Sequence, residues 1–82
     1  MATPPPEKRD PDLVAFGSRV RTLRNNAGLT QESLAAASGL HWTFIGQIER
    51  GTRNLSYRNV LRIAKGLGIA ASELVDVEQA QP

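Results

Sequence analysis

Glycine interrupts the middle of this 82-residue chain so often that any helix there must be short. The interruptions fall at Gly28, Gly39, Gly51 and Gly68. Between them, apolar residues recur at intervals of three and four, the spacing that places side chains on one face of a helix. Because isolated short helices are marginal in water, these segments must be stabilised by packing on one another. We therefore expect a bundle of short helices.

Two of the predicted helices precede Gly39. Asp12 is expected to cap the first, because a carboxylate accepts the unpaired N–H groups of a helix start. The apolar stripe of this helix consists of Leu13, Phe16, Val20, Leu23 and Ala27. The hydroxyl of Thr30 caps the second helix, where Glu32 complements the helix dipole and several alanines favour helix up to Gly39.

Two short helices are also predicted beyond Gly51. Ser56 caps the fourth helix of the chain. Its apolar stripe consists of Val60, Leu61, Ile63, Ala64 and Leu67. A short fifth helix is marked by Ile69, Leu74, Val75 and Val77. It starts either at the position of Ala70 or under a cap at Ser72. The chain has no alternating run of strand length and no internal repeat, so the predicted fold class is all-α, with five helices.

The second helix and the third, expected over residues 42–50, have the dimensions of a helix-turn-helix motif. Ala35 must be small because the two helices approach most closely there, and Gly39 permits the positive φ of the turn. Ile45 and Ile48 anchor the third helix to the core. The outer face, which is free to meet a ligand, carries Trp42, Thr43, Gly46, Gln47 and Arg50.

Positive charge is concentrated in the body of the chain. The net charge is +2, yet residues 13–67 contain eight Arg or Lys and only two acidic residues, Glu32 and Glu49. A basic body favours an anionic partner. An equal alternative is a charged surface that serves only solubility.

Residue content disfavours several other functions and divides the chain into three parts. There is no cysteine and one histidine, and no spacing typical of a catalytic triad, metal site or phosphate loop, so we expect neither an enzyme nor a bound metal or cofactor. No apolar run resembles a membrane span or secretory signal, which predicts a cytoplasmic protein without a membrane partner. Residues 1–11, with three consecutive prolines, are expected to be a disordered arm, residues 12–77 the folded domain, and residues 78–82 a tail.

The sequence resembles the phage-repressor, or Cro/XRE-type, helix-turn-helix family over about residues 13–76. The resemblance is carried by Gly28-Leu29-Thr30-Gln31-Glu32, Gly39-Leu40, Ile45-Gly46-Gln47-Ile48-Glu49-Arg50-Gly51 and Leu61-Arg62-Ile63-Ala64-Lys65-Gly66-Leu67-Gly68. Two further stretches resemble short stand-alone regulators, including restriction–modification controller proteins: Thr43-Phe44-Ile45 and residues 48–56. The resemblance implies a lambda-repressor-like domain whose third helix enters the DNA major groove. It also implies a prokaryotic or phage protein associated with the nucleoid.

Four residues at the third helix are candidates for base contacts. Gln47 presents a donor and an acceptor that match adenine, and Thr43 bonds a base edge or packs its methyl group on thymine. Gly46 shares their face. Trp42 stands where the family usually has a polar residue, and its indole either contacts DNA or packs on the protein.

Phosphate contacts are expected on both sides of the third helix. Thr30 and Gln31 lie at the start of the second helix, where unpaired N–H groups attract anions. His41 either caps the third helix or, when protonated, touches a phosphate, whereas Phe44 is expected to pack. The set is completed by Arg50, Arg53, Asn54 and Arg58. The family resemblance assigns Arg24 and Glu49 to a structural salt bridge between the first and third helices.

The sequence thus predicts a transcriptional regulator, either a repressor or an activator, that binds a specific sequence of double-stranded DNA. One short helix reads few base pairs, so specific binding is expected to require a homodimer on an inverted-repeat operator. The residues predicted at its interface are Leu67, Ile69, Leu74, Val75 and Val77, unless all of them cap the core. The alternative is an antitoxin-like or coactivator-bridging interaction module of the same fold, with another protein as its partner.

Overall fold

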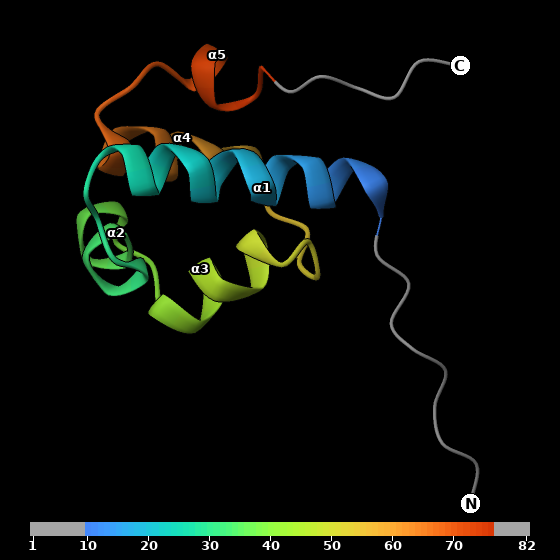
Figure 1. The fold of residues 1–82 in the computed structure, drawn as a ribbon, viewed down its shortest axis with the longest axis horizontal. Helices are drawn as coiled ribbons and strands as arrows, with labels where there is room; N and C mark the ends of the chain where they lie inside the picture. Colours follow the sequence, from blue (N-terminus) through green and yellow to red (C-terminus); the bar gives the residue numbers. More distant parts are fainter. Residues whose placement is uncertain (1–9, 77–82) are drawn as a thin grey trace, which may run out of the picture.

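The computed structural model describes residues 10–76, and this part of the chain folds into five helices without a strand (Figure 1). The helices are α1 (Pro11–Asn26), α2 (Gln31–Ser38), α3 (Trp42–Glu49), α4 (Tyr57–Leu67) and α5 (Ala71–Leu74). In Figure 1, α1 crosses the middle of the molecule, with α2 and α3 on one side of it and α5 on the other. The predicted all-α fold, with its helix-turn-helix at the second and third helices, is confirmed.

Side chains cap four of the five helices. Thr30 accepts the Ser33 N–H at 3.0 Å, and Ser56 accepts the Asn59 N–H at 3.2 Å, as predicted. The predicted cap at Asp12 is wrong: Asp10 accepts the Asp12 N–H at 2.8 Å, and α1 starts at Pro11. Proline suits the first helical position because the N–H it lacks has no partner there. The fifth helix starts after Ala70 without a side-chain cap, so Ser72 does not cap it.

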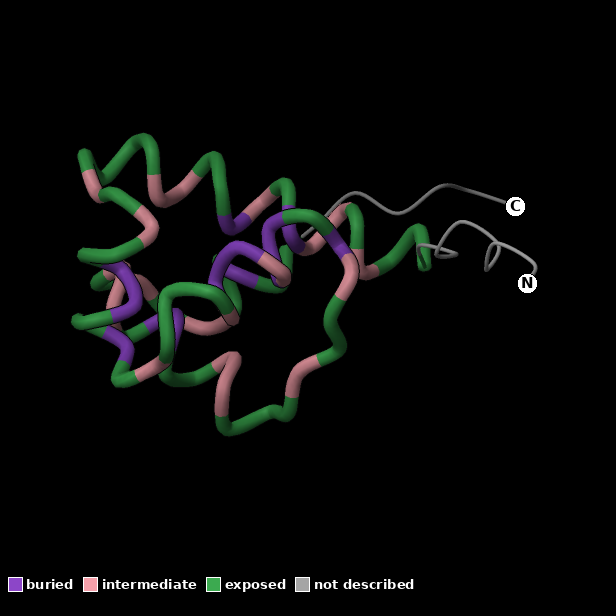
Figure 2. Tube along the Cα trace, turned by 90° about the horizontal axis from the view of Figure 1, so that it is seen from below, coloured by how far each residue is buried: buried purple, intermediate pink, exposed green. Residues whose placement is uncertain are grey.

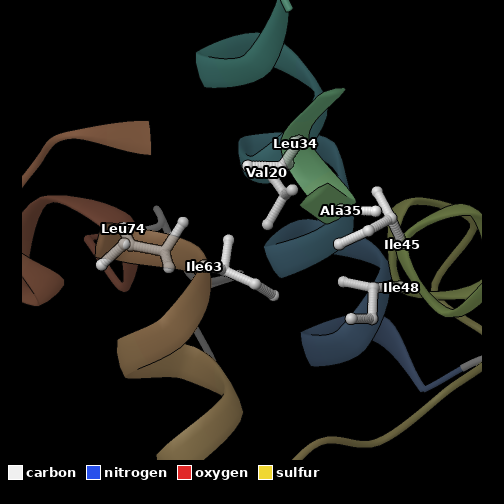
Figure 3. Packing of buried hydrophobic residues seen from close by; sticks show 8 residues of the cluster. Val20, Leu34, Ala35, Ile45, Ile48, Ile63 and Leu74 are labelled. Carbon is white, nitrogen blue, oxygen red and sulfur yellow. The ribbon is translucent and has the colours of Figure 1, made fainter. Parts of the chain in front are cut away.

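One apolar core joins all five helices. Its buried members are Val20, Leu34, Ala35, Ile45, Ile48, Ile63, Ala64 and Leu74. Their side chains converge from the separate helices (Figure 3), and buried residues gather on the inner sides of the chain trace (Figure 2). Leu61 was expected in the apolar stripe of α4, but it is 41% exposed because it lies on the solvent side of that helix. Burial of this apolar surface is the main stabilising contribution to the bundle.

Two glycines determine how α3 sits in the bundle. Gly39 ends α2 with a φ of +70°, which produces the sharp turn into α3. Gly17 of α1 is buried against the end of α3, and a Cβ atom there would overlap the carbonyl of Ile48 and lie 2.9 Å from the carbonyl oxygen of Glu49. Sequence reasoning did not single out Gly17, because a glycine inside a helix gives no sign of what packs on it. The backbone of α1 at Gly17 therefore packs directly on the backbone at the end of α3, with no side chain between them.

Within residues 10–76, none of the helices has the length and apolar character needed to cross a membrane. The same residues contain no group of acidic or histidine side chains arranged to hold a metal ion.

Candidate nucleic-acid interface

The two faces of α3 differ sharply in burial. Ile45 and Ile48 are buried in the core, whereas Trp42 and Thr43 are exposed. Gln47 is partly exposed on the same helix. One face of α3 is therefore apolar and packed in the core, and the other forms a polar and aromatic ridge of Trp42, Thr43 and Gln47.

Gly46 does not belong to the exposed face on which the sequence analysis placed it. It is buried between α2 and α3. A Cβ atom at this position would lie 3.3 Å from Nη1 of Arg50 and 3.5 Å from Oε1 of Gln31. The long side chains of these two residues cover the glycine, which the period of a single helix does not reveal. Gly46 therefore serves the packing of the two helices.

The start of α3 is capped by a histidine. Nδ1 of His41 accepts the N–H of Thr43 at 3.2 Å and lies 2.7 Å from the Thr43 hydroxyl oxygen. Of the two interpretations of His41, the structure contains the cap. The ring of Trp42 stacks on that of His41, with centroids 6.0 Å apart, while the indole stays 52% exposed. Trp42 thus remains available to a ligand at the tip of α3.

Glu49, at the end of α3, is the hub of a polar network. Its side chain is fully buried and lies 2.6 Å from Nε of Arg24, which forms the ion pair that the family resemblance implies. Three more donors reach the carboxylate: Nη2 of Arg24 at 3.0 Å, Nε2 of Gln31 at 3.1 Å and Nε of Arg21 at 3.3 Å. Arg24 also donates to the carbonyl of Leu29. The network ties α1, α2 and α3 together.

The charged state of Glu49 is stabilised despite its burial. Burial acts to raise its pKa, but the hydrogen bonds from Arg24 and Gln31, the positive charge of Arg24 and the hydrogen bond from Arg21 together outweigh it. The pKa of Glu49 is therefore lowered. The pKa of Arg24 is raised, because its hydrogen bond to Glu49 outweighs the effect of burial. The pair is fully ionised at neutral pH.

The two residues expected to hold phosphate at the start of α2 both have partners within the protein. The hydroxyl of Thr30 is engaged in the capping box with Ser33. The amide of Gln31 donates to Glu49 rather than pointing into solvent. Sequence reasoning missed this contact, and it missed Arg21, because the partners are 18 and 28 residues away along the chain. Arg21 lies one helical turn from Arg24, which is the only sequence signal for it.

The remaining candidates lie between the end of α3 and the first turn of α4. Arg50, Arg53 and Arg58 are exposed, and so is Asn54, whose Oδ1 accepts the N–H of Leu55 at 2.8 Å. Arg53 lies over the ring of Phe44, with its guanidinium carbon 5.2 Å from the ring centroid. Phe44 packs against the core, as expected. Two of these cations, Arg50 and Arg53, thus follow the end of α3, and Arg58 lies in the first turn of α4.

The predicted dimer surface is only partly accessible. Leu74 is fully buried in the core, so its assignment to an interface between subunits is wrong. Leu67 and Ile69 are half-buried against the core, whereas Val75 is 51% exposed. Val77 lies outside the described residues. Leu74 instead anchors α5 to the apolar core.

Comparison with known proteins yields several close relatives. A family model described as helix-turn-helix matches residues 20–74. The control protein C.BamHI of Bacillus amyloliquefaciens is 45% identical over 64 residues, which are 77% of this chain and 79% of that protein. The control protein C.MunI of Mycoplasma sp is 43% identical over 68 residues, covering 80% and 92%. The crystal structure of the restriction-modification controller protein C.AhdI from Aeromonas hydrophila aligns with a TM-score of 0.76 and 51% identity, covering 77% and 96%.

Proposed function

Because this chain belongs to the XRE-type helix-turn-helix family of DNA-binding transcription regulators, we propose that it recognises a specific duplex sequence by inserting α3 into the major groove. The observation that carries the proposal is the two-sided character of α3, with Ile45 and Ile48 buried and a polar, aromatic ridge exposed opposite them. The relatives of this chain are transcription regulators rather than enzymes.

Base contacts are assigned to the exposed side chains of α3. Gln47 offers an amide donor and acceptor to adenine. The methyl group of Thr43 faces thymine, since its hydroxyl is next to the histidine cap. Trp42 contributes apolar contact at the tip of the helix, where its exposed ring meets sugar or thymine methyl groups. Gly46 has no part in this contact.

Phosphate contacts are assigned to both flanks of α3. The cations Arg50, Arg53 and Arg58 with Asn54 face the backbone after α3, and their exposure supports this role. On the other flank, the first N–H groups of α2 meet a phosphate beside Thr30 and His41. Gln31 joins them only if its amide leaves Glu49, so its contribution comes second to the backbone groups.

The active species is proposed to be a homodimer on an inverted-repeat operator. Two copies related by a two-fold axis place equivalent helices about 34 Å apart on one side of the duplex. Val75 with Leu67 and Ile69 supplies the apolar surface between subunits. By analogy with C.AhdI, a restriction-modification controller protein, we infer that this chain regulates the genes of such a system.

Selection of bound fragments from random duplex DNA tests the proposal. The wild-type protein is expected to enrich an inverted repeat. Gln47→Ala then relaxes preference at one base pair per half-site, losing about 1–3 kcal/mol of discrimination there. Arg58→Ala weakens binding to every sequence alike and reduces the slope of log affinity against log salt by about 1. Equal affinity of the wild-type protein for all duplexes would refute sequence-specific recognition, and a lack of binding to any duplex would favour a protein-interaction module.

A further inference from the structure

Gln47 is held by the loop that follows α3 at both its backbone and its side chain. Its carbonyl oxygen accepts the N–H of Thr52 at 3.1 Å and the hydroxyl of Thr52 at 3.2 Å. Its side-chain Oε1 accepts a hydrogen bond from Nη1 of Arg53 at 3.3 Å. The loop is therefore joined by hydrogen bonds to Gln47 in the last turn of α3.

Arg53 also contacts the aromatic ring of Phe44. Its guanidinium carbon lies 5.2 Å from the centroid of the Phe44 ring, a distance at which a cation is attracted to the face of an aromatic ring. Phe44 is packed against the hydrophobic core, so the ring offers a fixed platform. Arg53 therefore contacts both the Phe44 ring, on the core side, and the amide of Gln47.

The contact with Arg53 distinguishes the oxygen end of the Gln47 amide from its nitrogen end, although the two ends are alike in shape. A guanidinium group donates hydrogen bonds but accepts none. Rotating the Gln47 amide by half a turn would bring its NH₂ group against the N–H groups of Arg53, donor against donor. The Oε1 end is therefore kept toward the loop, and Nε2 is the end left for another partner.

We propose that Arg53 is a positioning residue that selects the amide orientation of Gln47 and so sets the base preference of α3. The inference rests on the proposed function. With Nε2 presented to the groove, bases that offer an acceptor are favoured, and adenine is favoured most because the second lone pair of Oε1 accepts from its amino group. Cytosine presents its amino donor there and is disfavoured. This role is additional to the phosphate contact proposed for Arg53, because a phosphate contact carries no sequence information.

The experiment compares four duplexes that differ only at the base pair where Gln47→Ala loses preference. For wild-type protein, Arg53→Ala, Gln47→Ala and the double variant, the Kd for each duplex is measured at one salt concentration. Arg53→Ala is expected to lower the ratio of adenine to cytosine affinity by about tenfold, the scale of one good base contact. Adding Arg53→Ala to Gln47→Ala is expected to leave the ratio unchanged, because no amide remains to be oriented.

Two further variants separate orientation from charge. Arg58→Ala removes an exposed cation of α4 and is expected to weaken all four duplexes equally. Arg53→Lys keeps the charge and one donor toward Oε1 and should restore part of the ratio, which a role limited to fold or phosphate contact would not produce. Thermal melting by circular dichroism checks that the variants stay folded, as exposure of Arg53 predicts.

The possible results distinguish a failure of the role of Arg53 from a failure of the proposed sequence-specific DNA binding. If Arg53→Ala weakens all four duplexes by one factor and preserves the ratio, Arg53 is a phosphate contact only and the inference is overturned. The same holds if Arg53→Ala lowers the ratio as strongly without Gln47 as with it. If the wild-type protein itself prefers no duplex, the proposed function fails before the role of Arg53 is reached.

Discussion

Glu49 places a negative charge inside a bundle whose other buried side chains, within the described residues, are uncharged. Removing a carboxylate from water is costly unless its oxygens receive hydrogen bonds, and here Arg24, Gln31 and Arg21 provide them. The contributions are unequal, because the side chain of Arg24 is 12% exposed and that of Arg21 is 55% exposed. The buried pair therefore carries most of the coupling between α1 and α3.

The lowered pKa of Glu49 makes part of the stability depend on pH. A carboxyl group with a folded-state pKa below its ordinary value of 4.5 stabilises the fold above that pH, and the contribution is lost as pH falls through the folded-state pKa. Glu49→Gln should therefore lower the free energy of unfolding at neutral pH and flatten its decline in acid. Urea unfolding from neutral pH to about pH 3 measures both effects.

Arg21→Ala is the matched control for this network. Because Arg21 is mostly exposed, its loss should cost about 0.2–1 kcal/mol, whereas removing Glu49 should cost about 3–5 kcal/mol. A Glu49 variant that unfolds like the wild type at every pH but no longer binds DNA would assign the carboxylate to recognition instead of architecture.

At the level of helices, the placement of α3 depends on how closely α1 approaches it. Gly17 lies against the carbonyl groups that end α3, and α2 is joined to α3 by the turn at Gly39. Small residues at such crossings allow tight packing, and tightly packed elements do not yield to added volume. The direction of α3 is therefore set by contacts on its buried side, which leaves its exposed side free to vary.

Gly17→Ala tests this dependence. The added methyl group would overlap the carbonyl of Ile48, so α1 and α3 must separate, and the free energy of unfolding should fall by about 1–3 kcal/mol. The adjacent exposed residue supplies the control, because Ser18→Ala adds helix propensity without a clash. Chemical denaturation of both variants gives the comparison. Equal or greater stability of the Gly17 variant would mean that the crossing tolerates a side chain.

On the scale of the whole molecule, the proposed DNA surface and the proposed dimer surface are well separated. In Figure 1, α3 and α5 lie on opposite sides of α1. Arg19 of α1 fastens α5 by donating from Nε and Nη2 to the carbonyl of Glu73, at 3.2 and 2.9 Å. A dimer formed through α5 would thus leave α3 accessible and would hold the two α3 helices at a fixed spacing.

Val75→Asp tests the dimer. Val75 is half exposed, so a charge there should leave the monomer folded while opposing association of two apolar surfaces. Sedimentation is expected to show the wild type shifting to dimer at high micromolar concentration and the variant remaining monomeric. Tyr57→Asp introduces the same charge at another exposed residue, on α4, and should leave the dimer intact. A wild-type monomer at every concentration, with and without operator DNA, would exclude the dimer.

Local features of the fold were predictable from local sequence. The caps at Thr30 and Ser56, the turn at Gly39 and the burial of Ile45 and Ile48 follow from helix ends and from the period of a helix. One exception is the start of α1, where a competing acidic residue, Asp10, lies two positions before Asp12. Either carboxylate satisfies the capping rule, and the proline between them decides the outcome.

The sequence by itself determined which segments are helical, which face of each is apolar and which residues form the helix-turn-helix, because these depend on neighbours within about four residues. The tertiary structure alone decided that Gly46 is covered, that Leu74 is a core anchor, and that Gln31 turns to Glu49. It also decided that Arg53 meets Gln47 over Phe44. Each of these depends on side chains that become neighbours only when separate helices pack, and no periodicity within one helix encodes that contact.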